Sequence, residues 1–201
     1  MYCFSHINNP KFNTGGIQPY HCVQYGMWLY FLSNTLYHQF CAEPVAPGDS
    51  LGVSHEASSA ASEAIDVCDK IFMFNMMITQ MDIYYGHDMP DIWLPAHTSG
   101  SVFSPHAKIG NYFMFNHGCN VGLNHNTATP PIIEDCVIMM GHSKIIGNCH
   151  VGDHVVFGAN SYIKNMDVPS GSLVFGQYPN VVIKKDRKGI CERILEERFK
   201  K

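Results

Sequence analysis

The stretch "KIIGNCHVGDHVVFGANSYI" (144–163) places apolar residues at a constant interval of six. Glycine directly follows two of these residues, at Gly152 and Gly158. A six-residue period with recurring glycines is typical of a hexapeptide β-helix, in which three short strands make one coil and each strand points one side chain inward. The inward candidates in this stretch are Ile145, Val151, Phe157 and Ile163.

The same frame extends in both directions along the chain. From Phe103 to Val181 every sixth residue is hydrophobic except Thr127 and Pro169, although hydrophobic residues make up only 46% of the sequence. We therefore expect a mainly β protein whose second half forms roughly four coils. The other positions of the frame are Ile109, Phe115, Val121, Ile133, Met139 and Phe175.

One interruption of the frame concerns a histidine. Upstream, the six-residue step runs from Ile83 to Pro95, but eight residues separate Pro95 from Phe103. The repeat therefore slips by two residues, and the slip falls on "HTSG" (97–100). Because a slip breaks the regular inward stacking, we expect His97 to lie outside the core.

The residues before the repeat have a different pattern. Apolar residues at helical spacing predict helices over 17–40 and 56–80, and Ser54 is a plausible N-cap for the second. The Pro- and Gly-containing segment 43–52 is expected to connect them. The most apolar stretch, 25–37, is interrupted by polar residues and is too short to span a bilayer, so it predicts a buried helix and no membrane insertion.

Charge and cysteine pattern exclude other classes. A net charge of −4 argues against a nucleic-acid-binding protein, which needs a clustered basic face. The eight cysteines form no C-x-x-C pair, so a zinc knuckle is not expected. The start of the sequence, "MYCFSHINNPKF" (1–12), lacks the basic and apolar segments of a signal peptide, which predicts a cytoplasmic protein with reduced thiols.

The residues around the slip carry a family resemblance. In "QMDIYYGHDMPDIWLPAHTSGSVFSPHAKIG" (80–110), an Asp-Ile pair is followed, fifteen residues beyond Asp82, by His97 and Thr-Ser-Gly. This spacing resembles the serine acetyltransferases, which are hexapeptide-repeat acyltransferases. The likeness continues through 117–122, 144–163 and 168–185.

The resemblance implies an architecture and a reaction. It implies a left-handed parallel β-helix over 81–185. Apolar spacing adds a small α-helical N-terminal region over 1–80 and a short amphipathic helix over 186–201. The resemblance also implies acetyl-CoA as co-substrate, no metal, and a homotrimer with active sites between adjacent β-helices.

The resemblance also suggests roles for individual residues. His97 would be the general base that removes the proton of an acceptor hydroxyl, since imidazole exchanges protons near neutral pH. Asp82 would orient the imidazole, as the carboxylate does in a Ser-His-Asp triad. By position, the residues nominated for acetyl-CoA are Gly141, Ser143, Ala159, Ser161, Lys164 and Lys184, with Lys185 beside the last.

Two departures from the family concern the acceptor. Ala96 stands where the family carries Asp before the catalytic His, and Thr129-Pro130 stands at the place of an Arg-His pair. These missing groups are the ones expected to hold an amino acid, so the sequence favours a neutral acceptor: a sugar or sugar-linked hydroxyl in surface polysaccharide synthesis. Serine O-acetylation in cysteine biosynthesis is the alternative. Candidate acceptor-binding residues are Tyr84, Asn124 and His125, with Tyr85, Asn126 and Thr127 beside them.

Other readings fit the sequence less well. A γ-type carbonic anhydrase shares the β-helix, but it places two histidines five residues apart, and no pair among the twelve here has that separation. A non-catalytic β-helix scaffold would have no reason to keep Asp82 and His97 in register around a slip. No tight complex with cysteine synthase is expected, because the chain ends in the amphipathic "GICERILEERFKK" (189–201) and not in a flexible tail ending in Ile.

Overall fold

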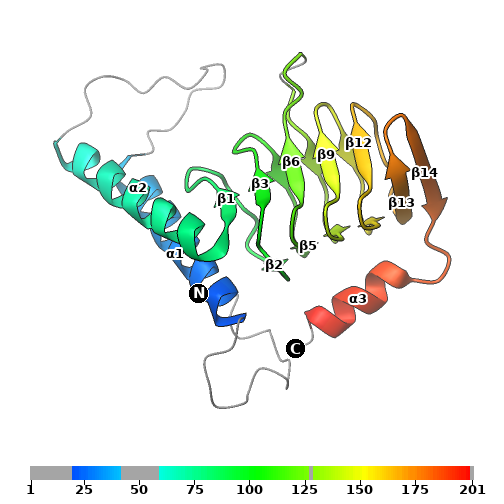
Figure 1. Cartoon of the computed structure of the whole chain (residues 1–201), viewed down its shortest axis with the longest axis horizontal. Helices are drawn as coiled ribbons and strands as arrows, with labels where there is room; N and C mark the ends of the chain where they lie inside the picture. The colour runs from blue at the N-terminus through cyan, green and yellow to red at the C-terminus, as the bar shows by residue number, and fades with distance from the viewer. Residues whose placement is uncertain (1–19, 42–58, 127–128, 200–201) are drawn as a thin grey trace.

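The six-residue period folds into short parallel strands that stack coil upon coil. A computed structural model describes residues 20–41, 59–126 and 129–199, and it forms a parallel β-helix of about five turns (Figure 1). One face consists of β1 (Met81–Ile83), β3 (Ser101–Phe103), β6 (Asn120–Gly122), β9 (Lys144–Ile146) and β12 (Tyr162–Lys164). The second consists of β2 (Trp93–Pro95), β5 (Phe113–Phe115), β8 (Ile138–Met139) and β11 (Val156–Phe157). The third consists of β4 (Lys108–Ile109), β7 (Ile132–Ile133) and β10 (His150–Val151).

The interior follows the predicted frame as far as Ile163. Its residues are almost all buried; Phe115, Val121 and Ile145 have no exposed surface. After Ile163 the frame shifts by one residue, because the next buried positions are Val168 and Val174. The predicted inward positions Pro169 and Phe175 are therefore wrong: both are exposed.

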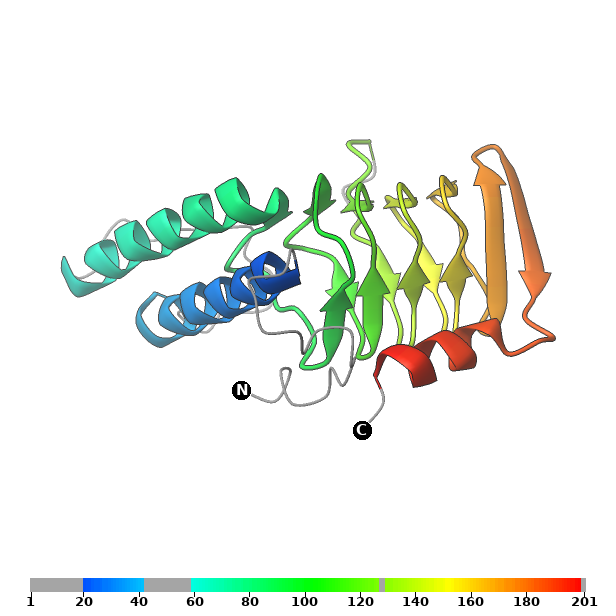
Figure 2. The same cartoon turned by 60° about the horizontal axis from the view of Figure 1, so that its bottom comes forward.

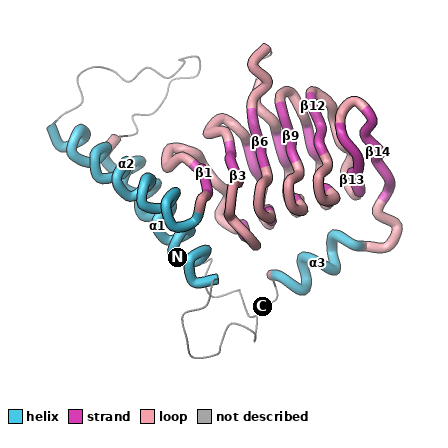
Figure 3. The backbone as a smooth tube through the Cα atoms, in the orientation of Figure 1, coloured by secondary structure: helices cyan, strands magenta, loops and turns pink. Residues whose placement is uncertain are grey.

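A second departure from regularity lies in the loop after β6. β7 begins ten residues after β6 ends, whereas β10 begins four residues after β9 ends. The loop thus contains six additional residues, which leaves the six-residue frame unchanged and hides the insertion from periodicity. It projects beyond the other turns at the same end of the strands (Figure 3). Thr127, a predicted repeat position, lies outside the described residues.

The chain closes the last coil with a hairpin. β13 (Ser172–Gln177) pairs in parallel with β11 and β12, and β14 (Asn180–Lys185) runs antiparallel to β13. Val174 on β13 is fully buried, and Val181 and Ile183 on β14 pack against the same core.

Two helices precede the first coil, as predicted. They are α1 (Tyr20–Phe40) and α2 (Ser59–Thr79), and they lie at one end of the stack (Figure 2). Met27 and Tyr30 of α1 enter the buried cluster that lines the β-helix, where the Tyr30 and Trp93 rings meet edge to face at 5.7 Å. The predicted N-cap Ser54 and connecting segment 43–52 lie outside the described residues. Among the described residues, no helix is long and apolar enough to cross a membrane.

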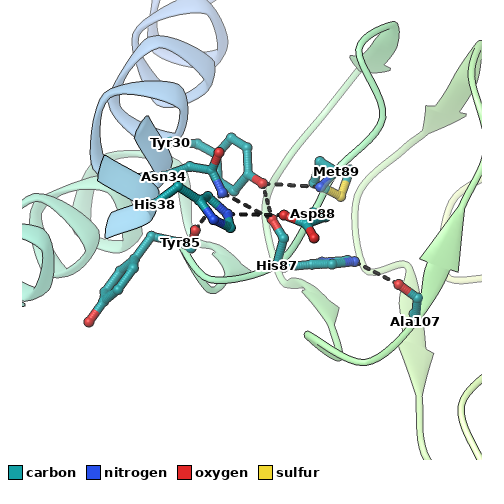
Figure 4. A network of polar contacts seen from close by, with 8 residues as sticks. All are labelled: Tyr30, Asn34, His38, Tyr85, His87, Asp88, Met89 and Ala107. Atoms are coloured by element: carbon teal, nitrogen blue, oxygen red, sulfur yellow. Dashed lines mark hydrogen bonds and ion pairs between the residues drawn. The ribbon is translucent and has the colours of Figure 1, made fainter. Parts of the chain in front are cut away.

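Polar contacts fix α1 against the first coil (Figure 4). The Tyr30 hydroxyl donates to the carbonyl oxygen of His87, and Asn34 Nδ2 donates to that of Tyr85 at 2.7 Å. His87 itself is buried and reaches the second coil, because its Nε2 donates to the carbonyl oxygen of Ala107 at 2.9 Å. The segment that follows Asp82 is thus hydrogen-bonded to α1 on one side and to the second coil on the other.

The C-terminal segment forms the predicted helix along one side of the stack. α3 (Ile190–Arg198) runs beside the stack (Figure 2). It buries Cys191 and packs Ile194 and Leu195 on the outward side chains of the second face. The Asp186 carboxylate accepts a hydrogen bond from the backbone N–H of Cys191 at 2.9 Å, which fixes the start of the helix. The outward side chains under α3 are Leu94, Met114, Ile138 and Val156.

Candidate active site

The predicted slip is visible in the register of neighbouring coils. Pro95 pairs with Phe115, and Val102 pairs with Asn120. Seven residues separate the first members of these pairs and five separate the second, so the turn from β2 to β3 contains two extra residues. His97 lies in this turn and is exposed, as predicted.

Hydrogen bonds hold the turn against the chain just before Asp82. Thr98 Oγ1 donates to the carbonyl oxygen of Thr79 at 2.7 Å, and the Gly100 N–H donates to that of Gln80 at 2.9 Å. The Ser99 hydroxyl also donates to the side-chain oxygen of Gln80. Asp82 follows two residues later on β1 and is half-buried. The direct contact between the Asp82 carboxylate and the His97 imidazole stays a prediction.

The turn belongs to a corner that continues along the stack, here called the histidine corner. Its residues with left-handed backbone include Gly100, Gly118 and His142, with φ of 71°, 65° and 61°. Backbone hydrogen bonds join successive turns: the Gly118 N–H donates to Ser99 at 2.8 Å, and the His142 N–H donates to His117 at 2.9 Å. The corner therefore presents corresponding side chains at successive levels.

Three imidazoles stack at this corner, and two of them were not predicted. The ring centroids of His97 and His117 are 6.1 Å apart, and those of His117 and His142 are 4.8 Å apart, both edge to face. His117 could have been found from the frame, because it follows the inward residue Phe115 by two positions, as His97 follows Pro95.

Two glycines make room for the rings. A Cβ on Gly118 would lie 2.3 Å from Nδ1 of His142, and a Cβ on Gly141 would lie 3.0 Å from Cε1 of His117. Each imidazole thus occupies the space left by the glycine of the neighbouring coil. The pairs His117-Gly118 and Gly141-His142 are therefore interlocked: each imidazole packs over the glycine of the other pair.

A surface groove runs along the corner. Its first section, of about 540 Å³, is lined by residues that include Ser99, His117, His142 and Lys144, and its second section continues past Tyr162. Beside the corner, the strand register aligns one row of outward-facing residues, and Lys144 belongs to this row. That row is Asp82, Val102, Asn120, Lys144 and Tyr162.

The structure distributes the predicted acetyl-CoA residues over several places. Gly141 and Ala159 lie at the histidine corner, next to His142 and Asn160. Ser143 and Ser161 are buried, and Ser161 Oγ donates to the carbonyl oxygen of Gly158 at 2.7 Å, so their hydroxyls do not face the groove as ligands of acetyl-CoA. Lys164 ends β12 at the far side of the face, and Lys184 is exposed on β14.

The predicted acceptor-binding residues are also divided. Tyr84 follows Asp82 by two positions, is 36% exposed and contacts the Tyr85 ring at a tilt of 36°, with ring centroids 4.2 Å apart. Asn124 and His125 follow the end of β6, whereas the histidine corner precedes its start. Within one chain they therefore lie at the opposite end of the face from His97.

The described residues contain no group of three or more His, Cys, Asp or Glu side chains placed to hold a metal ion, and the three stacked histidines do not form one. These imidazoles contact one another through their rings and do not converge on a common ion-binding point.

Solved structures share this architecture. No family model matches the chain, and no curated protein matches it. A serine acetyltransferase in complex with CoA superposes with a TM-score of 0.60 at 18% identity, covering 81% of this chain and 57% of that one. The serine acetyltransferase of Brucella abortus strain S19 gives 0.65 at 19%, covering 89% and 63%. Its complex with coenzyme A gives 0.63 at 18%, covering 89% and 62%.

The chain has the fold of these serine acetyltransferases. The resemblance inferred from the sequence is thereby confirmed at the level of the fold. The chain spans about three-fifths of the length of the structures it matches.

Proposed function

We propose that the protein is an acetyl-CoA-dependent O-acetyltransferase that acts on a hydroxyl of a small acceptor. The observation that carries this proposal is the turn with two extra residues that presents His97 and is hydrogen-bonded to Thr79 and Gln80, close to Asp82 in the chain. Solved neighbours with the same fold are serine acetyltransferases with CoA bound, which supports the choice of co-substrate.

The chemistry requires one base. His97 removes the proton of the acceptor hydroxyl as its oxygen attacks the thioester carbonyl carbon, and Asp82 stabilises the imidazolium that forms. The C–S bond then breaks, the acetyl group remains on the acceptor oxygen, and the CoA thiolate takes up the proton. Because the hydroxyl attacks directly, no cysteine nucleophile is needed.

Two acceptors are supported by different observations. A neutral sugar or sugar-linked hydroxyl is supported by Ala96 and by Thr129-Pro130, which provide no charge to pair with an amino acid. Serine is the second candidate, since the solved neighbours are serine acetyltransferases.

The test is acetyl transfer to a mixed panel of amino acids, free sugars and nucleotide sugars. Thiol release from acetyl-CoA reports turnover, and mass spectrometry identifies the acetylated product. A His97→Ala variant should lose the signal. A His150→Ala variant should keep it, because His150 pairs with Glu134 on the third face. Absence of thiol release with every acceptor would contradict the proposal.

We further infer a cytoplasmic homotrimer that forms no tight complex with cysteine synthase. Exposed apolar residues on the outside of the β-helix, such as Val102 and Ile132, support assembly, and the packing of the amphipathic α3 on the second face supports the absence of the complex. Co-elution with cysteine synthase from a sizing column would overturn the latter inference.

A further inference from the structure

Three side chains of the groove have no polar partner in the described part of the chain. The side chains of His117, His142 and Lys144 are exposed, line the same section of groove, and form no hydrogen bond or ion pair with any described residue. Elsewhere, His150 pairs with Glu134 at 2.8 Å.

The backbone at the corner places side chains at the groove in the later coils. Gly100 and Gly118 occupy the left-handed corner position in the earlier coils, whereas His142 and Asn160 occupy it in the later ones, with φ of 61° and 60°. The interlock of 117–118 with 141–142 holds both rings at the groove.

We propose that His117, His142 and Lys144 bind a phosphate or diphosphate group that belongs to the acceptor. Each imidazole supplies at least one N–H donor and the ammonium supplies three, which suits a phosphoryl group whose several oxygens accept in different directions. The inference rests on the proposed function and refines it. The acceptor is a phosphorylated or nucleotide-linked sugar whose reacting hydroxyl lies at His97.

Distance favours the acceptor over CoA as the source of the phosphate. Successive coils are about 5 Å apart, so His142 lies two coils, about 10 Å, from His97. The chain of CoA between its sulfur and its first phosphate spans about 15 Å when extended, by the spacing of a peptide of similar bond count. With its arm extended along the stack, a thioester at His97 would therefore place the CoA phosphates beyond His142.

Binding of inorganic pyrophosphate tests the subsite without any activity. By calorimetry, His142→Gly and Lys144→Gln should each raise the Kd for pyrophosphate about 10- to 100-fold, the loss of one charge-assisted hydrogen bond. His154→Gly is the matched control for backbone, because His154 has φ of 56° at another corner, and Lys108→Gln is the control for charge. Equal binding by wild type and all four variants, or none by wild type, would overturn the subsite.

Kinetics then identify the source of the phosphate. In His142→Gly, the KM for a nucleotide sugar should rise about 10-fold or more, while the KM for acetyl-CoA stays within about twofold. A rise confined to acetyl-CoA would overturn the assignment to the acceptor. If wild type releases no thiol, the proposed O-acetyltransferase function fails, and the calorimetric comparison still decides whether the subsite exists.

Discussion

Replacing Gly118 by alanine tests the interlocked arrangement of His117 and His142. The residue has φ of 65°, so any side chain there is strained by about 1–2 kcal/mol. The new Cβ would also lie 2.3 Å from Nδ1 of His142, which forces that ring to leave its place. Loss of the edge-to-face contact with His117 adds about 0.5–1.5 kcal/mol. The total destabilisation should be about 1.5–3.5 kcal/mol.

Urea unfolding at one protein concentration separates these two contributions. Gly171→Ala is the matched control, because Gly171 has φ of 67° and a Cβ there meets no atom within 4 Å, so it reports strain alone. Gly118→Ala should lower the free energy of unfolding more than Gly171→Ala does. In a His142→Gly background the two substitutions should have equal effects, because no ring then lies above Gly118. If Gly118→Ala and Gly171→Ala have equal effects in the wild-type background, the His142 ring does not occupy the space above Gly118.

The remaining predictions concern catalysis, acid stability and assembly. His97→Ala should lower turnover in the thiol-release assay about 10²–10⁴-fold with little change in the apparent affinity for acetyl-CoA, and near wild-type turnover would remove His97 from the mechanism. Burial lowers the pKa of His87, whose Nε2–H donates to Ala107 and whose Nδ1 has no partner among the described residues. Because the unfolded chain takes up this proton below about pH 6.5 and the folded chain resists it, the free energy of unfolding should fall as pH drops below that value. His87→Gln should flatten this dependence in urea titrations at several pH values, and an unchanged slope would contradict the assignment. Light scattering should give about three times the 22.5 kDa of one chain, whereas a stable monomer would refute the trimer.

The sequence predicted the β-helix and the exposed turn well because both depend on local spacing. One residue per strand points inward, so a six-residue period and a two-residue slip are legible without knowledge of the folded chain. The end of the frame was misplaced because the chain loses one residue between Ile163 and Val168, a shift that the apolar residues Pro169 and Phe175 conceal, since each follows a buried valine. Val174 is buried while Phe175, equally apolar, is exposed.

The stacked imidazoles were missed for a different reason. They meet across coils whose lengths differ: 20 residues separate His97 from His117, and 25 separate His117 from His142, since the enlarged loop after β6 intervenes. No constant spacing connects them in the sequence. Only the register of Phe115 with Met139 in the folded stack brings the last two together.

The capped ends of the stack bear on how copies of the chain assemble. An open coil end exposes unpaired strand edges onto which another chain can add, and repeated addition gives fibres. Here α1 inserts Met27 and Tyr30 at one end, and at the other β14 closes the last coil and ends in the charged pair Lys184-Lys185. We therefore expect little growth along the axis and expect copies to associate through the sides. Since α3 already covers the side formed by β2, β5, β8 and β11, the described chain leaves two sides for contact, and the histidine corner borders one of them.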